Sequence, residues 1–272
     1  FQRNANLSDI YEAEIYLKRE DLQMVRSYKI RGAYNKIRTI DPGLVTNGIV
    51  CASAGNHAQG VAFSCSKLKI MGSIFMPVTT PRQKIEQVRM FGKEFIEIIL
   101  TGDTFDAANS AAIAYAKENN KTFIPPFDDP KVMEGQGTIG REILNQSKEP
   151  LDYIFVPIGG GGLASGLGAY ISQMSPDTKI IGVEPGGAPC MKAAIENGGP
   201  VKLEHIDKFV DGAAVQLAGT HTYEVCRQVL DDIIVVPEGA VCTTIIHMYN
   251  KSAIVVEPAG ALAVAALKFY QI

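Results

Sequence analysis

Short apolar runs and longer amphipathic segments alternate along almost the whole chain. The apolar runs are rich in β-branched and aromatic residues, as in Tyr-Ile-Phe-Val at 153–156 and Ile-Ile-Gly-Val at 180–183. Such runs predict buried strands, whereas apolar residues spaced three or four apart predict helices. The predicted strands are 14–18, 48–52, 70–76, 94–100, 122–124, 153–158, 179–184 and 232–236. The predicted helices are 58–68, 82–91, 104–118 and 163–174.

Strands and helices that alternate at this spacing are typical of βαβ units, in which neighbouring strands are parallel. Because the strands are apolar without interruption, the sheets should be covered by helices on both faces. The fold class is therefore α/β. Prolines and aspartates at 125–130 form the best internal break, and a domain hinge is expected there.

Composition narrows the class of partner. The chain has 272 residues, 46% hydrophobic and 20% charged, with 26 basic and 29 acidic side chains and a net charge of -3. A slightly acidic chain argues against nucleic acid or an anionic membrane surface as the main partner. The longest stretch without a charge, 153–176, contains Pro157 and four glycines, which would break a spanning helix.

The cysteines and histidines show no metal-ligand or redox spacing. Five cysteines, an odd number with no Cys-x-x-Cys pair, indicate reduced thiols and a cytoplasmic protein. The four histidines are scattered, with no pair at the spacing of a zinc site. We therefore expect no metal.

A run of glycines marks the first candidate site. Gly159, Gly160, Gly161, Gly162 and Leu163 follow a predicted buried strand and open a predicted helix. Free N–H groups at a helix N-terminus favour a phosphate, and glycines let the backbone come close to it. The alternative structural interpretation is a plain tight turn.

The glycine run also permits a second phosphate ligand. Gly159-x-Gly161-x-x-Ala164 satisfies the dinucleotide fingerprint, and Glu184 ends the next strand. A nicotinamide-dependent oxidoreductase is therefore an alternative. A P-loop is excluded because no Lys-Ser or Lys-Thr follows the glycines.

The second candidate site follows another strand. Ser53, Ala54, Gly55, Asn56 and His57 lie at the carboxyl end of an apolar strand, where open α/β sheets bind ligands. Small residues with a hydroxyl and free N–H groups can bind a carboxylate. The simpler interpretations are a helix cap by Ser53 or Asn56 and a structural hydrogen bond by His57.

The third is a lysine within Arg-Ser-Tyr-Lys-Ile-Arg-Gly-Ala at 26–33. A lysine is usually a solvated surface residue. A buried lysine with a lowered pKa can instead form a Schiff base, and Lys29 is the candidate.

These three motifs, in this order, resemble the pyridoxal-phosphate-dependent threonine dehydratases (threonine deaminases) of the tryptophan-synthase-β fold. The resemblance spans nearly the whole chain. It includes the segments 16–21, 76–77, 135–138 and 257–261. The one departure beside the lysine is Tyr28, where the family usually has Phe.

The resemblance implies a role for each motif. Lys29 would hold pyridoxal 5'-phosphate covalently and act as general base, and Asn56 would contact the ring hydroxyl. The five residues from Gly159 to Leu163 would hold the phosphate, and the five from Ser53 to His57 would clamp the substrate carboxylate. The implied reaction is β-elimination of L-threonine, and of L-serine, to 2-oxobutanoate or pyruvate and ammonia.

The resemblance also implies an architecture. This is the second fold type of pyridoxal-phosphate enzymes, with two open parallel-sheet domains and the cofactor in the cleft. Residues 46–129 would form a smaller domain inserted into a larger one of 1–45 plus 130–272. The protein would be a homo-oligomer, a dimer or tetramer. Segments 16–21 and 257–261 look closer to the biosynthetic form, which starts isoleucine synthesis.

Related activities remain as alternatives. Serine racemases are similar but carry a Ser at the position of Ala54. The hydroxyl of that Ser supplies a proton to the face of the substrate opposite the lysine. They also bind a divalent cation at positions that match Glu184, Ala188 and Cys190. A Cys there removes one oxygen ligand, so we expect no cation. A non-catalytic amino-acid sensor is a third possibility, against which the retained Lys29 argues.

The ends of the chain suggest a longer enzyme. In the family, the pyridine nitrogen meets a Ser or Cys on a Ser-Gly-Gly-Asn-like loop after the final strand. The chain stops at Ile272 without such a loop. It also starts at Phe1, after the point where relatives have a Thr-Pro-Leu segment. We therefore expect a truncated chain whose pyridine-nitrogen partner lies beyond Ile272.

Overall fold

A computed structural model describes residues 1–271 and divides the chain into two compact units. Unit 1 comprises Phe1–Asp21, Phe127–Asp129 and the chain from Gln136 onward, and unit 2 comprises Leu22–Pro126 and Pro130–Gly135. These units are defined by compactness alone. The predicted insertion of a 46–129 domain into a larger domain stays a prediction.

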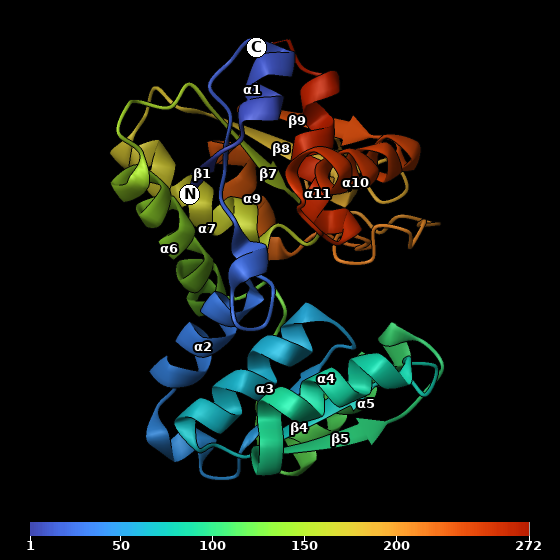
Figure 1. Ribbon diagram of the computed structural model, residues 1–272. Helices are drawn as coiled ribbons and strands as arrows, with labels where there is room; N and C mark the ends of the chain where they lie inside the picture. Colours follow the sequence, from blue (N-terminus) through green and yellow to red (C-terminus); the bar gives the residue numbers. More distant parts are fainter. Residues whose placement is uncertain (272) are drawn as a thin grey trace. The chain divides into compact units, whose positions relative to one another are not determined.

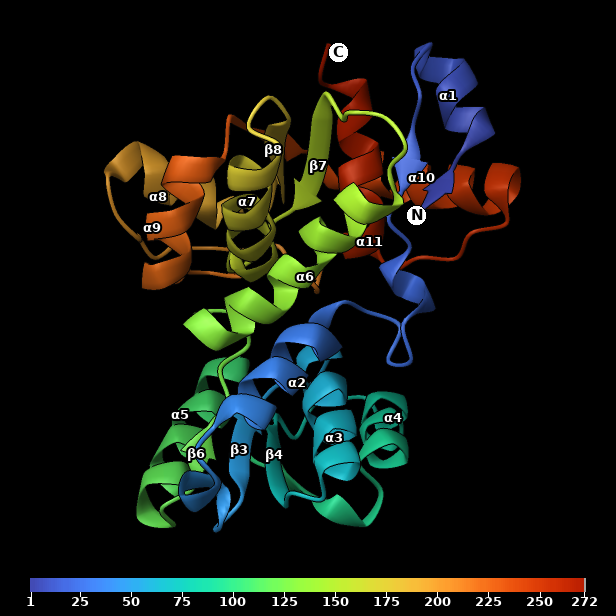
Figure 2. The same ribbon diagram turned by 90° about the vertical axis from the view of Figure 1, so that its left-hand side faces the viewer.

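Unit 2 is built on a four-stranded parallel sheet with the strand order β5-β4-β3-β6. Its strands are β3 (Ile49–Ala52), β4 (Gly72–Met76), β5 (Ile96–Leu100) and β6 (Thr122–Phe123). Its helices are α2 (Lys29–Thr39), α3 (Asn56–Leu68), α4 (Arg82–Gly92) and α5 (Phe105–Glu118), with short 3-10 turns at Pro42–Val45 and Lys93–Phe95. Figure 2 shows α5 on one side of β3 and β4, and α3 and α4 on the other.

The strand β3 explains why this sheet is covered on both faces. All four of its residues are buried. Ile49 and Cys51 join the core that contains the side chains of α2 and α3, whereas Val50 and Ala52 join the core under α5. Because successive side chains point to opposite faces, an apolar strand without interruption needs a helix on each side.

Unit 1 contains a three-stranded parallel sheet with the order β7-β8-β9. Its strands are β7 (Tyr153–Pro157), β8 (Lys179–Pro185) and β9 (Asp232–Val236). Its helices are α1 (Ala5–Tyr11), α7 (Gly162–Met174), α8 (Cys190–Asn197), α9 (Thr220–Val229), α10 (Glu238–Ser252) and α11 (Pro258–Ala265). Helix α6 (Pro130–Gln146) begins in unit 2 and continues in unit 1.

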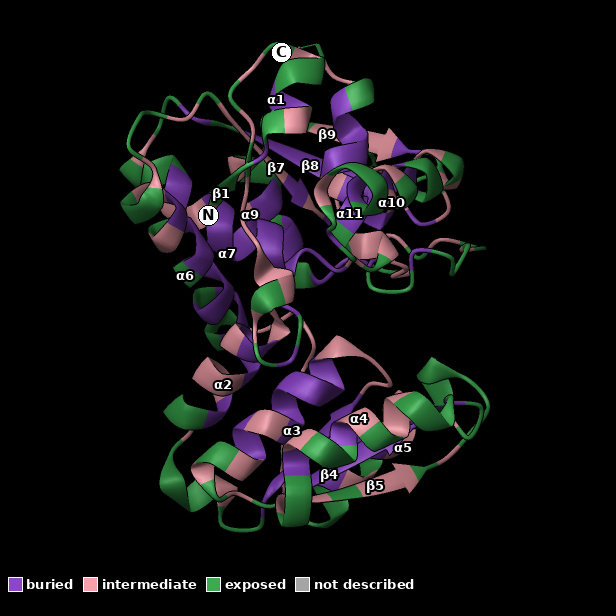
Figure 3. Cartoon of the chain, viewed as in Figure 1, coloured by how far each residue is buried: buried purple, intermediate pink, exposed green. Residues whose placement is uncertain are grey.

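The helices of unit 1 also lie on two sides of its sheet. Val183 of β8 and Val236 of β9 are buried with the side chains of α10 and α11. Helices α7 and α9 pack on each other at Gly168, where an added Cβ would lie 2.4 Å from Val229. In Figure 1 the strands β7, β8 and β9 run between these groups, and Figure 3 shows buried residues concentrated there.

Most predicted elements are present, and the parallel sheets are confirmed. The predicted strand at 14–18 is wrong in extent and kind. Only β2 (Tyr16–Leu17) forms, and it pairs antiparallel with β1 (Gln2–Arg3) rather than joining a parallel sheet. The helices α1, α2, α6, α8, α9 and α10 were not predicted. Among the described residues, no helix is long and apolar enough to cross a membrane.

Candidate functional site

Lys29 is the first residue of helix α2, and two glycines fix its backbone. An added Cβ at Gly60 of α3 would lie 3.1–3.2 Å from backbone atoms of Lys29 and Ile30. An added Cβ at Gly135 of α6 would lie 2.6 Å from the carbonyl oxygen of Arg31. Only glycine permits these close helix crossings. They explain why glycines stand at positions 60 and 135, a role that sequence reasoning did not assign.

The amine of Lys29 is positioned by a backbone carbonyl. Its Nζ donates to the carbonyl oxygen of Pro126 at 2.9 Å and lies 5.6 Å from the centre of the Tyr28 ring. The lysine is half-buried. A primary amine held within unit 2, rather than extended into solvent, is suited to nucleophilic or general-base chemistry.

In the motif from Ser53 to His57, residues 53–55 form the turn between β3 and α3, and Asn56 and His57 are the first two residues of α3. The hydroxyl of Ser53 accepts a hydrogen bond from the N–H of Gly55 at 3.1 Å. The residue that precedes α3 is Gly55, and no side chain caps the helix, so the alternative interpretation of Ser53 or Asn56 as a cap is not borne out. The turn lies at the carboxyl end of β3, where Ala54 and Asn56 are half-buried.

His57 makes a structural hydrogen bond at the start of α3. Its side chain is buried, and its Nε2 lies 3.0 Å from the carbonyl oxygen of Ile124. Burial, and then the charge of Lys29, lower the pKa of His57 to about 3. With the pKa this low the imidazole is neutral, and the tautomer that carries Nε2–H donates to this carbonyl. His57 therefore supports the turn and carries no charge near neutral pH.

The glycine turn of unit 1, defined as Gly159–Gly162, has the geometry of an anion site. Gly161 has a φ of +92°, a conformation that glycine adopts without strain. Among the described residues, no acceptor contacts the N–H groups of Gly160, Gly161 or Gly162. Helix α7 begins at Gly162, with Leu163 next, and has no acidic residue in its first turn. Unpaired N–H groups at the positive end of a helix favour a phosphate.

Phe127 packs against the back of this turn. An added Cβ at Gly160 would lie 2.4–2.5 Å from three carbons of the Phe127 ring, and one at Gly162 would lie 2.9 Å from its Cβ. Glycine is thus required on the packed side, while the N–H groups remain available. The phosphate of pyridoxal phosphate fits this arrangement. The N–H groups of the glycine turn are available to it, and the closely packed Phe127 side chain supports the turn. No sequence signal marked Phe127.

Glu184 has a structural role. It is fully buried, and its carboxylate accepts from the N–H groups of Met191 and Lys192 at 2.7 and 2.8 Å. Burial raises its pKa to about 7, although these hydrogen bonds oppose the shift. Both oxygens are engaged, so Glu184 does not offer the ribose contact that the nicotinamide alternative requires.

The absence of a divalent cation beside Glu184 stays a prediction, and the neighbouring residues are consistent with it. Ala188 lies in the turn between β8 and α8, and Cys190 is the first residue of α8. Burial raises the pKa of the Cys190 thiol to about 12. A protonated thiol is a poor ligand for a hard cation. Within residues 1–271 no group of three His, Cys, Asp or Glu side chains is arranged to hold a metal.

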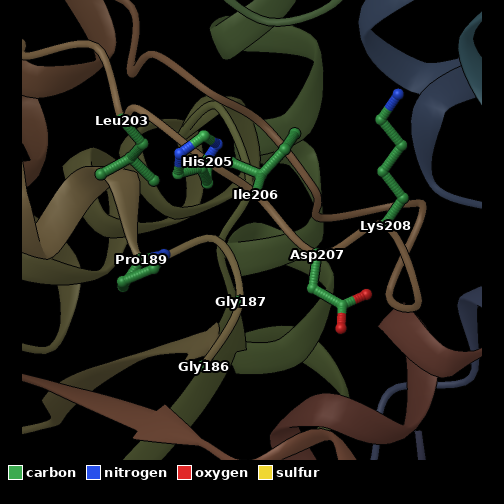
Figure 4. Close-up of a pocket in the computed structure, with 8 residues that line it drawn as sticks. All are labelled: Gly186, Gly187, Pro189, Leu203, His205, Ile206, Asp207 and Lys208. Atoms are coloured by element: carbon green, nitrogen blue, oxygen red, sulfur yellow. The ribbon is translucent and has the colours of Figure 1, made fainter.

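A separate open groove of about 640 Å³ lies beside this turn in unit 1. Figure 4 shows Leu203, His205 and Ile206 together on one side, with the backbone of Gly186 and Gly187 opposite, while Lys208 extends away from the others. None of the predicted site residues lines it.

Comparison with known proteins identifies the family. A profile described as "Pyridoxal-phosphate dependent enzyme" matches residues 2–271. The chain belongs to this family. The α/β fold and the cofactor, pyridoxal phosphate, are thereby confirmed, and the nicotinamide alternative is set aside.

This pyridoxal-phosphate-dependent chain has close curated relatives. It is 57% identical over 270 residues to the biosynthetic L-threonine dehydratase of Halalkalibacterium halodurans, covering 99% of this chain and 65% of that protein. It is also 57% identical to the enzyme of the same name from Bacillus subtilis, of which it covers 64%. The chain therefore spans just under two thirds of the length of these relatives.

Solved structures agree on the fold. The processed form of threonine deaminase isoform 2 from Solanum lycopersicum superimposes with a TM-score of 0.94 at 42% identity, covering 98% of this chain and 78% of that one. Maize serine racemase superimposes with a TM-score of 0.93 at 31% identity, covering 100% of this chain and 82% of that one. The second pyridoxal-phosphate fold type predicted from the sequence is confirmed.

Proposed function

We propose that this pyridoxal-phosphate-dependent enzyme is a threonine ammonia-lyase. It converts L-threonine to 2-oxobutanoate and ammonia, with the water lost in the elimination returned by hydrolysis. The proposal is supported by the curated relatives named biosynthetic L-threonine dehydratase at 57% identity and by the threonine deaminase neighbour at 42% identity. The observation that carries it is Lys29, fixed at the start of α2 by Gly60 and Gly135.

The cofactor, when bound, supplies the electron sink, and the protein supplies placement and protons. Lys29 forms the covalent link to it. The N–H groups of the glycine turn, with Leu163, bind its phosphate. Asn56 contacts the ring hydroxyl, and the backbone and hydroxyl groups of Ser53, Ala54, Gly55, Asn56 and His57 bind the substrate carboxylate.

Lys29 also acts as the general base for the proton on the substrate Cα. Once its amine is released, it removes the proton from the substrate Cα as general base. The carbonyl oxygen of Pro126, which accepts from Nζ at 2.9 Å, then stabilises the protonated amine. A carbonyl acceptor suits this role because it favours the charged form without binding a proton itself.

Ala54 favours elimination over racemisation. A methyl side chain offers no proton to the face opposite Lys29, so the substrate carbanion cannot be reprotonated there by this residue. L-serine should also react, because the missing methyl group is worth only about 1–3 kcal/mol in a pocket. We therefore propose threonine and serine as substrates, with products 2-oxobutanoate and pyruvate.

The setting of the reaction follows from the same relatives. We propose that the enzyme is the biosynthetic form, which supplies 2-oxobutanoate for isoleucine. We further propose a cytoplasmic homo-oligomer, a dimer or tetramer.

The decisive experiment removes the amine. In Lys29→Ala, we expect both the visible absorbance of lysine-bound cofactor and the release of 2-oxobutanoate to disappear, because tether and base are one group. Lys67→Ala, an exposed lysine of α3 in the same unit, is the matched control and should keep both. Turnover of L-threonine by Lys29→Ala at near the wild-type rate would overturn the assignment.

A further inference from the structure

The carbonyl groups of the glycine turn are held by three buried side chains. Thr222 Oγ1 donates to the carbonyl oxygen of Gly160 at 2.6 Å, and the N–H of Gly219 approaches the same oxygen at 3.5 Å. The thiol of Cys190 donates to Gly159 O at 3.3 Å. The thiol of Cys226 donates to Gly161 O at 3.8 Å. Three successive carbonyls therefore have side-chain partners from distant parts of the sequence.

These contacts fix the direction of the opposite N–H groups. The described chain contains no cis peptide bond. In a trans peptide, the C=O and the N–H point in opposite directions. With the carbonyls of residues 159, 160 and 161 turned toward their donors, the N–H groups of residues 160, 161 and 162 point away from them. These are the N–H groups without an acceptor in the described chain.

Thr222 makes the strongest of the three contacts. Its hydroxyl is fully buried, and a separation of 2.6 Å is short for an O–H···O bond. Thiols are weak donors, and Cys190 also interacts with Glu184. The Thr222 hydroxyl has a second contact with Gly219 O, but at 3.3 Å. The orientation of the Gly160–Gly161 peptide therefore depends mainly on Thr222.

Helix α9 presents Thr222 and Cys226 together. Residues four apart lie on one face of a helix, so both side chains reach the turn from the same side. The start of α9 is itself fixed, because the carboxylate of Asp128 accepts from the N–H groups of Thr220, His221 and Thr222 at 3.0, 2.8 and 3.1 Å. The support of the glycine turn thus extends to the segment that contains Phe127.

We propose that Thr222 is a positioning residue for the cofactor phosphate: it holds the carbonyl of Gly160 so that the N–H of Gly161 is preoriented toward the phosphate. Cys226 assists it at the next peptide. This inference rests on the glycine turn being the phosphate site of the proposed function. Without the hydroxyl, the Gly160–Gly161 peptide can rotate, and part of the binding energy is used to restore it.

The experiment compares two ligands that differ only in the phosphate. Pyridoxal phosphate and pyridoxal both react with Lys29, but pyridoxal cannot use the glycine turn. Dissociation constants for both are measured by absorbance in the purified protein and in the variants Thr222→Val and Thr222→Ser. Thr244→Val is the matched control, because Thr244 is a buried threonine of α10 whose hydroxyl donates to Ala240 O at 2.8 Å, away from the turn.

We expect Thr222→Val to raise the dissociation constant of pyridoxal phosphate about three- to tenfold, the range of one net hydrogen bond. The dissociation constant of pyridoxal should not change. Thr222→Ser should restore the wild-type value, and Thr244→Val should change neither. Should Thr222→Val fail to fold, Thr222→Ala takes its place and should give the same selective loss. Equal weakening of both ligands, or no weakening of either, would overturn the inference.

The same measurements separate this inference from the proposed function. Wild-type protein that binds pyridoxal phosphate more tightly than pyridoxal, yet releases no 2-oxobutanoate from L-threonine, contradicts the proposed activity and leaves the role of Thr222 standing. Wild-type protein that binds both ligands equally contradicts the role of Thr222, whatever its activity.

Discussion

A methyl group added at Gly160 should disturb the packing of Phe127 against the glycine turn. The new Cβ would lie 2.4–2.5 Å from three carbons of the Phe127 ring, whereas carbon atoms in contact prefer about 3.5–4.0 Å. One of the partners must therefore move by about 1 Å. Phe127 packs closely on Gly162 as well, since its Cβ and Cα lie 2.9 and 3.1 Å from where a Cβ at Gly162 would stand, so a shift of its ring also disturbs that contact.

The size of the effect follows from this crowding. Inserting a methyl group into a packed site costs about 1–3 kcal/mol. We expect Gly160→Ala to lower the free energy of unfolding by that amount in the absence of cofactor. If binding pyridoxal phosphate requires the displaced turn to return at the same cost in free energy, the affinity should fall by about 5- to 150-fold. The reason is that the displaced N–H groups no longer meet the phosphate together.

Urea denaturation of the cofactor-free protein and titration with pyridoxal phosphate measure the two effects. Gly239→Ala in α10 is the control, because an added Cβ there meets no atom within 4 Å. It should stabilise the protein by about 0.5–1 kcal/mol, the helical preference of alanine over glycine, and leave cofactor binding unchanged. Gly160→Ala combined with Phe127→Leu should recover part of the loss. Wild-type stability and affinity in Gly160→Ala would refute the packing argument.

Three further predictions concern the two units separately. Ala54→Ser should raise the ratio of D-serine to pyruvate formed from L-serine, measured by chiral chromatography, because it adds a hydroxyl on the face opposite Lys29; an unchanged ratio removes the argument from Ala54. His57 has a folded pKa of about 3, below its unfolded value of 6.5, so only the unfolded state takes up a proton between these values and stability falls with falling pH. From pH 7 to pH 5 the wild type should lose about 2 kcal/mol more than His57→Gln, which can still donate to Ile124 O, and parallel pH profiles would contradict the lowered pKa. Asp128→Asn should lower the free energy of unfolding by about 1 kcal/mol, because one carboxylate oxygen at the start of α9 becomes a donor; urea denaturation that matches the wild type would show that this cap is unimportant.

The sequence by itself determined the local structure and the chemistry of the motifs. Apolar β-rich runs such as 153–156 became parallel strands, because a buried strand with apolar residues on both faces has few alternatives. The glycine run became the turn at the start of α7, because four glycines permit conformations that other residues do not. The order of the three motifs indicated the family, and the family profile confirmed it.

Local patterns failed where longer-range packing decides. Helix α2, which carries Lys29, was not predicted; its buried face holds only the apolar residues Ile30, Ala33 and Ile37 together with Gly32. The predicted strand at 14–18 shrank to β2, since its partner is the equally short β1 rather than a central strand. The alternative interpretation of Ser53 or Asn56 as the cap of α3 does not hold, and Ser53 instead accepts from the N–H of Gly55 inside the turn.

The tertiary structure alone decided what supports the site. The partners of the three glycine-turn carbonyls lie 31, 62 and 65 residues away in the sequence, and Pro126 O lies 97 residues from Lys29. No local pattern can indicate such a pairing, because a Thr or Cys on a helix looks like any other core residue until the fold places it. Motifs specify which atoms can react or bind, whereas the orientation of those atoms depends on contacts that form only when distant segments pack together.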